Sequence, residues 1–117
     1  MVASPPFHLN WTTQLRKGLL ELAILNALAA KPLYGYDIVR QLGDIDSLVI
    51  SEGTIYPILT RLRGEQYVES FTEDSPDGPP RKYYRLTTAG QQQLGRMNEH
   101  WQRLRDAIEA LRKERSS

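Results

Sequence analysis

The sequence predicts a mainly α-helical chain with one small β-hairpin and a long final helix. Three observations indicate this architecture. Apolar residues recur every three or four positions in three segments before residue 65, two segments of β-type residues flank a proline-rich turn, and an apolar heptad pattern follows the hairpin. At 117 residues the chain has the length of a single domain, so these elements are expected to share one core.

The first predicted helix covers residues 15–30, in which leucines recur at steps of three and four. A second apolar stripe makes this helix apolar around much of its circumference, which favours burial on two sides, one of them by another subunit. Pro32 ends the helix, because proline cannot continue the hydrogen-bond ladder. Residues 1–10 contain Pro5 and Pro6 and lack periodicity, so we expect a mobile N-terminal arm there.

Two shorter helices follow. The first is predicted over residues 36–42, with Gly43 as its stop, and a loop at residues 44–50 that includes a candidate short strand at 48–50. Ser51 suits the N-cap of the next helix. The core face of that third helix follows the i, i+3, i+4, i+7 pattern and consists of Ile55, Ile58, Leu59 and Leu62.

The hairpin is predicted from strands at residues 67–72 and 81–86, joined by a turn at residues 74–80. Alternation along the second strand places Tyr84 and Leu86 on one face and Tyr83 and Arg85 on the other.

The last helix is expected to begin after a Thr87 cap and to run to about residue 112. Its heptad positions are Leu94, Met97, Trp101, Leu104, Ile108 and Leu111. So regular a pattern favours a partner helix, whereas the alternative is packing on the chain's own domain. Because the first helix also has surplus apolar surface, we expect a homodimer. Leu15, Leu19 and Leu22 are expected to join the six heptad residues in its interface.

Helices followed by a hairpin in this order are typical of a winged helix-turn-helix, in which the third helix is the recognition helix. The expected organisation is a DNA-binding domain at residues 11–86 and a dimerisation helix at residues 87–117. On a helical wheel Gly53, Pro57, Thr60 and Gly64 face outward, flanked by Thr54 and Arg61 on one side and by Tyr56 and Arg63 on the other.

Glycine costs about 1 kcal/mol in a helix interior, so an outward face of small residues suggests close approach to another surface. The floor of the DNA major groove, about 12 Å wide, is such a surface, and the amides after Ser51 could hold a phosphate. The alternative is that Gly53 and Pro57 only set the geometry of a short helix.

Two further segments point to phosphate contacts. Arg81, Lys82 and Arg85 cluster after the turn, which suits a wing that grips the DNA backbone, although charge on a strand edge also prevents aggregation. In Tyr34-Gly35-Tyr36, glycine could bring the chain close to a phosphate while the phenols donate hydrogen bonds. The alternative is aromatic core packing.

Charge and composition limit the functions open to the chain. The net charge is +1, and residues 33–86 hold six basic and nine acidic side chains. The DNA-binding hypothesis therefore rests on pattern, and a winged-helix protein-interaction module without DNA binding is the second hypothesis. There is no cysteine, and the two histidines are far apart in sequence, so we expect no metal, no cofactor and no catalysis. The chain lacks a secretory signal and a membrane-spanning segment, and we expect a cytoplasmic protein.

The segments together resemble the PadR family, the phenolic-acid-responsive transcriptional regulators of bacteria and archaea. The resemblance is carried by residues 19–28, by Tyr34-Gly35-Tyr36-Asp37-Ile38, by residues 50–62 (ISEGTIYPILTRL), and by residues 80–87 (PRKYYRLT) followed by Gly90. It extends from about residue 15 into the last helix and implies a winged-helix homodimer that binds a pseudo-palindromic operator, usually as a repressor. The single terminal helix is similar to the short subgroup, which lacks a separate effector domain.

The resemblance places Trp101 where some multidrug-sensing relatives have a tryptophan lining a pore at the dimer interface, so Trp101 marks a candidate pocket for a small aromatic or apolar effector. The alternative is that Trp101 is only a core residue. The family usually has glycine where this chain has Gln66, so either the recognition helix ends early or Gln66 adopts a left-handed conformation. The expected DNA-binding residues are Tyr34, Tyr36, Ser51, Gly53, Thr54, Tyr56, Pro57, Arg61, Arg81 and Lys82.

Overall fold

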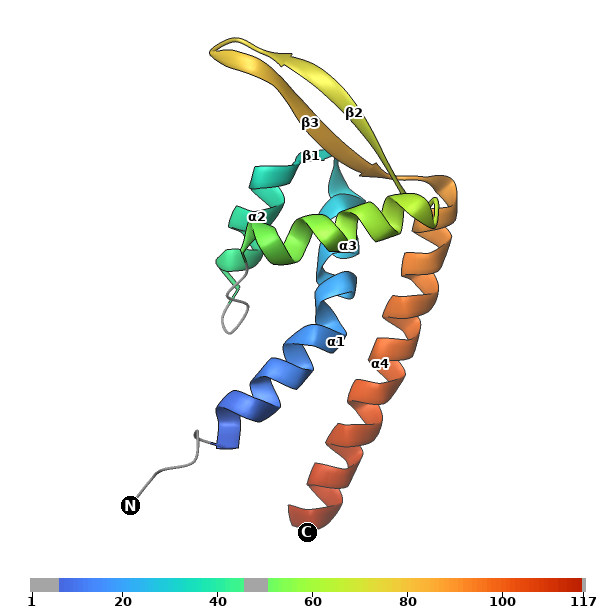
Figure 1. Ribbon diagram of the computed structural model, residues 1–117. Helices are drawn as coiled ribbons and strands as arrows, with labels where there is room; N and C mark the ends of the chain where they lie inside the picture. The colour runs from blue at the N-terminus through green and yellow to red at the C-terminus, as the bar shows by residue number, and fades with distance from the viewer. Residues whose placement is uncertain (1–6, 46–50, 117) are drawn as a thin grey trace, which may run out of the picture.

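The computed structural model describes residues 7–45 and 51–116. The elements follow in the order α1 (Phe7–Ala30), β1 (Leu33–Tyr34), α2 (Gly35–Gly43), α3 (Glu52–Gly64), β2 (Val68–Ser75), β3 (Gly78–Leu86) and α4 (Thr88–Ser116). The helices α1 and α4 pack against each other, and Figure 1 shows the start of α1 and the end of α4 at the same end of the molecule, while the β2–β3 hairpin projects from the opposite end. The mainly helical winged helix-turn-helix predicted from the sequence is confirmed.

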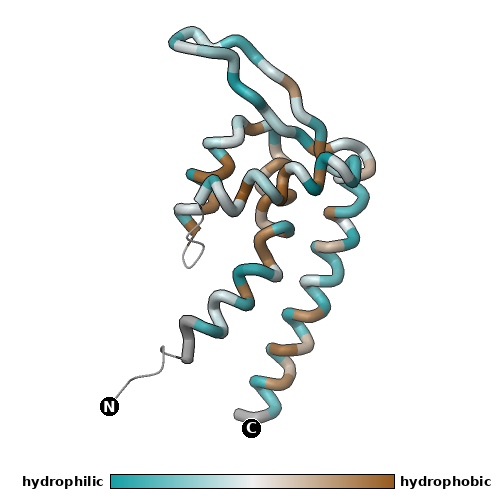
Figure 2. The backbone as a smooth tube through the Cα atoms, viewed as in Figure 1, coloured by the Kyte–Doolittle hydropathy of each residue, from teal (hydrophilic) through white to brown (hydrophobic). Residues whose placement is uncertain are grey.

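The core lies where α1, α2, α3 and the base of the sheet meet. Each of these elements contributes at least one fully buried aliphatic side chain. Figure 2 shows the hydrophobic residues of α1, α2 and α3 gathered where these helices meet. The buried set is Leu20, Ile24, Leu25, Leu28, Leu33, Ile38, Leu42, Ile55, Leu59, Leu62, Val68, Tyr84, Leu86 and Leu94. The predicted core face of α3 is confirmed, with Ile58 half-buried at its margin.

The sheet has three antiparallel strands in the order β1-β3-β2. The sequence did not predict β1, because it is only two residues long and is defined by its pairing, Leu33 with Tyr84 and Tyr34 with Tyr83. The hairpin is longer than predicted, since Ser75 pairs with Gly78 and most of the expected turn is strand. Pro79 and Pro80 lie beside a register shift, where proline interrupts few ladder hydrogen bonds.

Helix boundaries differ from the prediction at both ends of the chain. The helix α1 begins at Phe7, so the expected mobile arm is wrong for residues 7–10. The first six residues and the candidate strand at residues 48–50 lie outside the described residues. At the other end α4 continues to Ser116, one turn beyond the predicted stop.

The sequence left two alternatives for the junction between α3 and β2, an early helix end or a left-handed Gln66, and the structure has both. The helix ends at Gly64, and Gln66 has a left-handed φ of 66°. The Tyr67 amide donates to the Leu62 carbonyl at 3.0 Å and the Gln66 amide donates to the Arg63 carbonyl at 3.0 Å, which is the Schellman pattern that usually has glycine at this position.

A hydrogen bond from the residue before α4 connects the start of this helix to the junction. The Thr87 hydroxyl donates to the Gln66 carbonyl at 2.6 Å and accepts from the Gly90 amide at 2.9 Å, so the predicted Thr87 cap is confirmed. A Cβ at Gly90 would lie 1.9 Å from the Tyr67 carbonyl oxygen. Only glycine at position 90 lets α4 approach the first wing strand this closely.

Candidate nucleic-acid interface

The outward face of α3 is exposed as the helical wheel indicates. Gly53, Thr54, Pro57, Thr60 and Gly64 are all exposed, opposite the buried core face. No large side chain covers the middle of this face among the described residues, so another surface can approach the backbone of α3 closely.

Ser51 occupies the N-cap position of α3, but its side chain makes no capping hydrogen bond. Its hydroxyl pairs with the Thr54 hydroxyl at 3.3 Å, while its carbonyl accepts from the Thr54 and Ile55 amides. The first-turn amides are therefore not covered by the Ser51 side chain. The acidic side chain of Glu52 follows directly, as is favourable at a helix N-terminus.

Tyr56 lies against the start of α2 and is half-buried. A Cβ at Gly35 would lie 2.8 Å from the Tyr56 hydroxyl oxygen and 2.9 Å from a ring carbon. The close approach predicted at Gly35 thus serves the Tyr56 ring within the chain. Burial is the main cause that raises the pKa of Tyr56, with Glu52 adding to it, so the phenol stays a neutral donor.

The two tyrosines around Gly35 have different environments. Tyr34 is half-buried in β1, with its ring centroid 5.9 Å from that of Tyr83, whereas Tyr36 is 47% exposed. The alternative of aromatic packing therefore describes Tyr34, and Tyr36 presents its ring to solvent at the start of α2.

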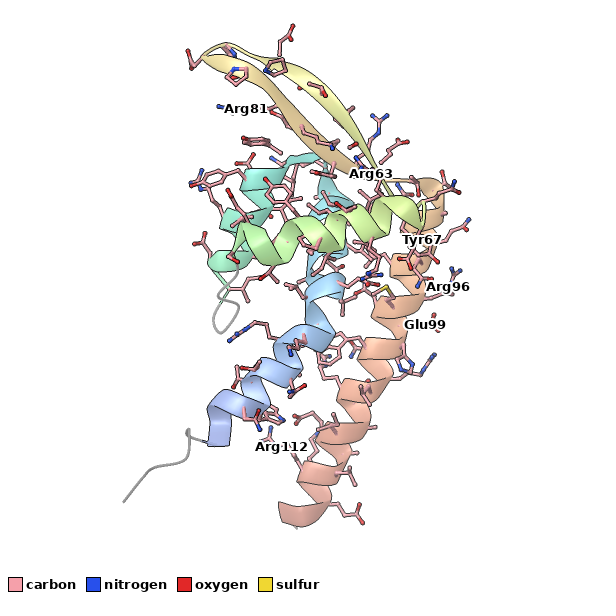
Figure 3. All side chains as sticks on the ribbon, viewed as in Figure 1. Arg63, Tyr67, Arg81, Arg96, Glu99 and Arg112 are labelled. Atoms are coloured by element: carbon pink, nitrogen blue, oxygen red, sulfur yellow. The ribbon has the colours of Figure 1, made fainter. Side chains whose placement is uncertain are left out.

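Adjacent wing residues face opposite sides of the sheet. Arg81 lies on the face that carries Tyr34, Tyr83 and Phe71, with its guanidinium carbon 5.1 Å from the Tyr34 ring centroid. Lys82 lies on the other face, with Nζ 5.9 Å from the Tyr84 ring centroid. Arg81 and Lys82, predicted as one basic cluster, therefore cannot act through the same face of the wing. Figure 3 shows Arg81 beside the hairpin.

The arginines of α3 and the wing also differ in their partners. Arg61 donates to Glu21 of α1 and to Glu65, the latter at 2.9 Å, and its pKa is raised mainly by the hydrogen bond to Glu21. Arg85 pairs with Glu69 at 2.6 Å and stacks over Phe71. Arg63, which was not among the predicted site residues, donates to the Ser70 hydroxyl at 3.2 Å. Its signal in the sequence was its place beside the outward face of α3.

The predicted interface residues of α1 and α4 divide into two groups. Leu94 is 5% exposed and belongs to the chain's own core, and Leu19, Leu22, Met97 and Trp101 are half-buried. The rest of the heptad is uncovered: Leu104 is 48%, Ile108 49% and Leu111 67% exposed, and Leu15 is also exposed on α1. The first heptad residues of α4 therefore pack against the chain's own domain, whereas the last three are not covered by any of the described residues.

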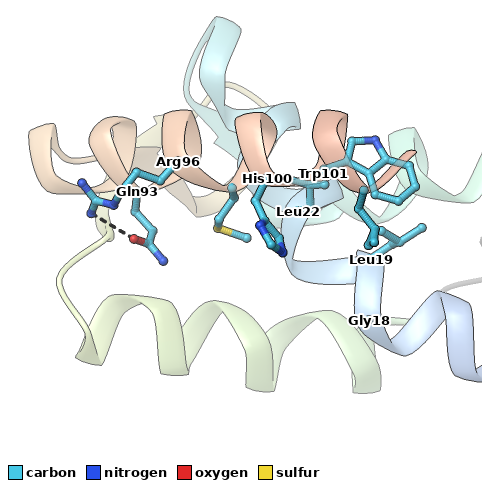
Figure 4. Close-up of a pocket in the computed structure, with 9 residues that line it drawn as sticks. Gly18, Leu19, Leu22, Gln93, Arg96, His100 and Trp101 are labelled. Carbon is cyan, nitrogen blue, oxygen red and sulfur yellow. Dashed lines mark hydrogen bonds between the residues drawn. The ribbon is translucent and has the colours of Figure 1, made fainter. Parts of the chain in front are cut away.

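An open cavity of about 480 Å³ lies where the two helices diverge (Figure 4). One end is polar, where Arg96 donates to Gln93 at 3.0 Å, and the other end is lined by the apolar side chains of Leu19 and Trp101. His100 also lines it. Trp101 therefore contributes an aromatic wall to a recess of small-molecule size.

Two properties of the described residues limit other functions. No cluster of three or more histidine, cysteine or carboxylate side chains there could hold a metal ion. Within the same residues, none of the helices has the length and apolar character needed to cross a bilayer.

The fold, the exposed small-residue face of α3 and the wing that carries Arg81 and Lys82 define a winged-helix protein of the DNA-binding regulator class. Residues 24–96 match the Transcriptional regulator PadR-like family, and the chain belongs to that family. It is 35% identical to a PadR-like transcriptional regulator of Bacillus cereus, with a TM-score of 0.77 over 84% of this chain and 95% of that one.

Two further relatives are similar to this chain over most of its length. A PadR family transcriptional regulator of Eggerthella lenta is 32% identical, with a TM-score of 0.77 over 87% of this chain and 88% of that one. An uncharacterised protein of Lysinibacillus sphaericus is 32% identical over 95 residues, which cover 80% of this chain and 87% of the relative. The PadR resemblance inferred from the sequence is confirmed.

Proposed function

We propose that the chain is a homodimeric, sequence-specific DNA-binding repressor that a small-molecule effector releases from its operator. The observation that carries this proposal is the exposed small-residue face of α3, together with the exposed Arg81 and Lys82 on the wing and the exposed Tyr36 ring. In a symmetric dimer, two such helices about 34–36 Å apart would enter successive major grooves of a pseudo-palindromic site.

In this proposal, Gly53, Thr54 and Pro57 form the surface that approaches the base edges, and Tyr36, Arg81 and Lys82 contact the phosphate backbone. Tyr34 and Tyr56 support the surface from below, because both are half-buried against neighbouring elements. The amides after Ser51 add an uncapped helix N-terminus that favours a phosphate oxygen.

Dimerisation is supported by the uncovered apolar residues of α1 and α4. Trp11 and Leu15 are exposed on α1, as are Leu104, Ile108 and Leu111 on α4. Several large apolar side chains left exposed on two helices are typical of an interface between proteins. A second copy of the chain would bring the same exposed apolar side chains of α1 and α4 to the interface, where the two copies could bury them.

The test is selection from a random duplex DNA library by the purified protein at near-physiological salt, followed by sequencing. Enrichment of an inverted repeat supports a symmetric DNA-binding dimer, and the repeat spacing gives the half-site geometry. Absence of enrichment, from protein shown to be folded and dimeric, contradicts the proposal and favours the protein-interaction module.

The effector part of the proposal is tested through Trp101. Planar aromatic compounds are titrated while tryptophan fluorescence is recorded, and Trp101→Phe and Trp11→Phe separate the two emitters. Quenching that disappears in Trp101→Phe and persists in Trp11→Phe supports an aromatic effector in the cavity. A Trp101 signal that no compound changes contradicts it.

A further inference from the structure

Two arginines near the end of α3 point to opposite sides of the helix. Arg61 and Arg63 are two positions apart, which corresponds to about 200° of helical rotation. Arg61 points toward α1, where it meets Glu21, and Arg63 points toward β2, where it meets Ser70. Figure 3 shows Arg63 beside the base of the hairpin.

Arg61 is held by two carboxylates. Its two terminal nitrogens donate separately to Glu21 and Glu65. In the sequence of α1, Glu21 follows Leu20, which is buried in the core, and precedes Leu22, which lines the cavity between α1 and α4. A phosphate that took Arg61 from these partners would leave two carboxylates unpaired beside the DNA backbone. The geometry therefore opposes a phosphate contact and instead ties α3 to α1.

Arg63 has a neutral partner. Its hydrogen bond to Ser70 fixes the guanidinium at the corner between α3 and the wing without neutralising its charge. No ion pair involves Arg63 or Lys82 among the residues the structure describes. Two uncompensated cations therefore remain on this side of the wing.

Arg63 and Lys82 lie on the same face of the hairpin. Ser70 is the register partner of Tyr84, and the next pair outward on that face is Thr72 with Lys82. The Lys82 ammonium lies over the Tyr84 ring, and Ser70 brings Arg63 to the same row. The two cations thus flank one row of the sheet, next to the outward face of α3.

We propose that Arg63 and Lys82 are the phosphate-binding cations of the corner between α3 and the wing, and that Arg61 is a positioning residue that holds α3 against α1 through Glu21. This assignment rests on the proposed function. It replaces Arg61 by Arg63 in the predicted DNA contacts and places the phosphates that Arg63 and Lys82 contact over the Lys82 face of the wing, so that Arg81 makes its phosphate contact separately from the opposite face.

The experiment measures binding of a fluorescent random-sequence duplex over a series of salt concentrations, by anisotropy, for single glutamine variants. A substitution that removes one phosphate contact reduces the slope of log affinity against log salt by about one. Arg63→Gln and Lys82→Gln are each expected to give this reduction, whereas Arg63→Lys keeps the charge and the slope. Arg85→Gln is the matched control, because Arg85 is paired with Glu69 on the opposite face.

The role of Arg61 as a positioning residue is tested with the duplex enriched from the random library. Arg61→Gln and Glu21→Gln are expected to reduce the preference for this duplex over random sequence while the salt slope stays unchanged. The exchanged pair Glu21→Arg with Arg61→Glu is expected to restore the preference, which a purely local loss of stability would not do.

The outcomes separate the assignment from the proposed function. An unchanged slope in Arg63→Gln, or a slope reduced as much by Arg61→Gln, overturns the assignment while DNA binding stands. Folded wild-type protein that binds no duplex at low salt overturns the proposed function, and the assignment with it.

Discussion

The part of the molecule around α3 and the part formed by α1 and α4 differ in how completely one chain can build them. Around α3, the aliphatic side chains of the core are buried by neighbours from the same chain. Along the second half of α4, apolar side chains of the same kind are half to two-thirds exposed. Since burial of apolar surface drives both folding and association, the first region is complete in one chain, and the second leaves the apolar surface that the proposed dimer would bury.

The largest expected effect is in the complete region. Leu59→Ala removes a fully buried side chain of α3 and should lower the free energy of unfolding by about 3 kcal/mol, because the closely packed site leaves a cavity. Urea denaturation followed by circular dichroism measures it. The loss should be similar at low and high protein concentration, and a strongly concentration-dependent loss would show that this core also depends on a partner.

Ile108→Asp tests the incomplete region. Ile108 is 49% exposed, so the substitution should leave the fold of one chain intact. It should weaken self-association by about 2 kcal/mol, roughly thirtyfold, because a carboxylate would be buried in the partner interface. Sedimentation velocity measures the change. Arg103→Asp on an exposed flank of the same helix is the matched control, and equal loss in both variants would mean that Ile108 is not in an interface.

The same contrast explains what the sequence could and could not predict. The core face of α3 was predictable because Ile55, Leu59 and Leu62 are spaced by the helix period and their environment is local. The heptad pattern correctly predicted that α4 is a long helix, but it could not tell where cover by the chain ends. Leu94 and Leu104 have the same periodicity, and only the path of α1 decides that the first is buried and the second is not.

The candidate interface shows a second limit. The sequence predicted the outward face of α3. It also indicated that Gln66 stands at a position where a left-handed backbone would favour glycine, and Gln66 does have a positive φ. It could not identify the partner of Arg61, because Glu21 is 40 residues away. One of its two interpretations of Gly35 was close approach to a phosphate, whereas the space beside Gly35 holds the Tyr56 ring. Long-range partners of polar and small residues depend on the tertiary arrangement.

A smaller effect is expected where the two regions meet. Thr87→Ala should destabilise the chain by about 1 kcal/mol, because its hydroxyl both caps α4 and holds the Gln66 carbonyl. Ser51→Ala should cost only a few tenths, since the Ser51 side chain makes no capping bond. Thermal denaturation of both variants measures the difference, and equal losses would show that the Ser51 hydroxyl caps α3 in solution.

The smallest effect has the opposite sign. Gln66 closes α3 with a φ of 66°, a conformation that strains a residue with a Cβ and that glycine adopts freely. Part of the relieved strain is offset, because glycine gives the unfolded chain more conformational freedom. Gln66→Gly should therefore raise the free energy of unfolding by about 0.5 kcal/mol, as measured by urea denaturation. Glu65→Gly is the control, since its φ of −83° offers no strain to relieve and glycine there should only destabilise. A loss of stability in Gln66→Gly would mean that the junction between α3 and the wing is held by contacts of the Gln66 side chain rather than limited by its backbone.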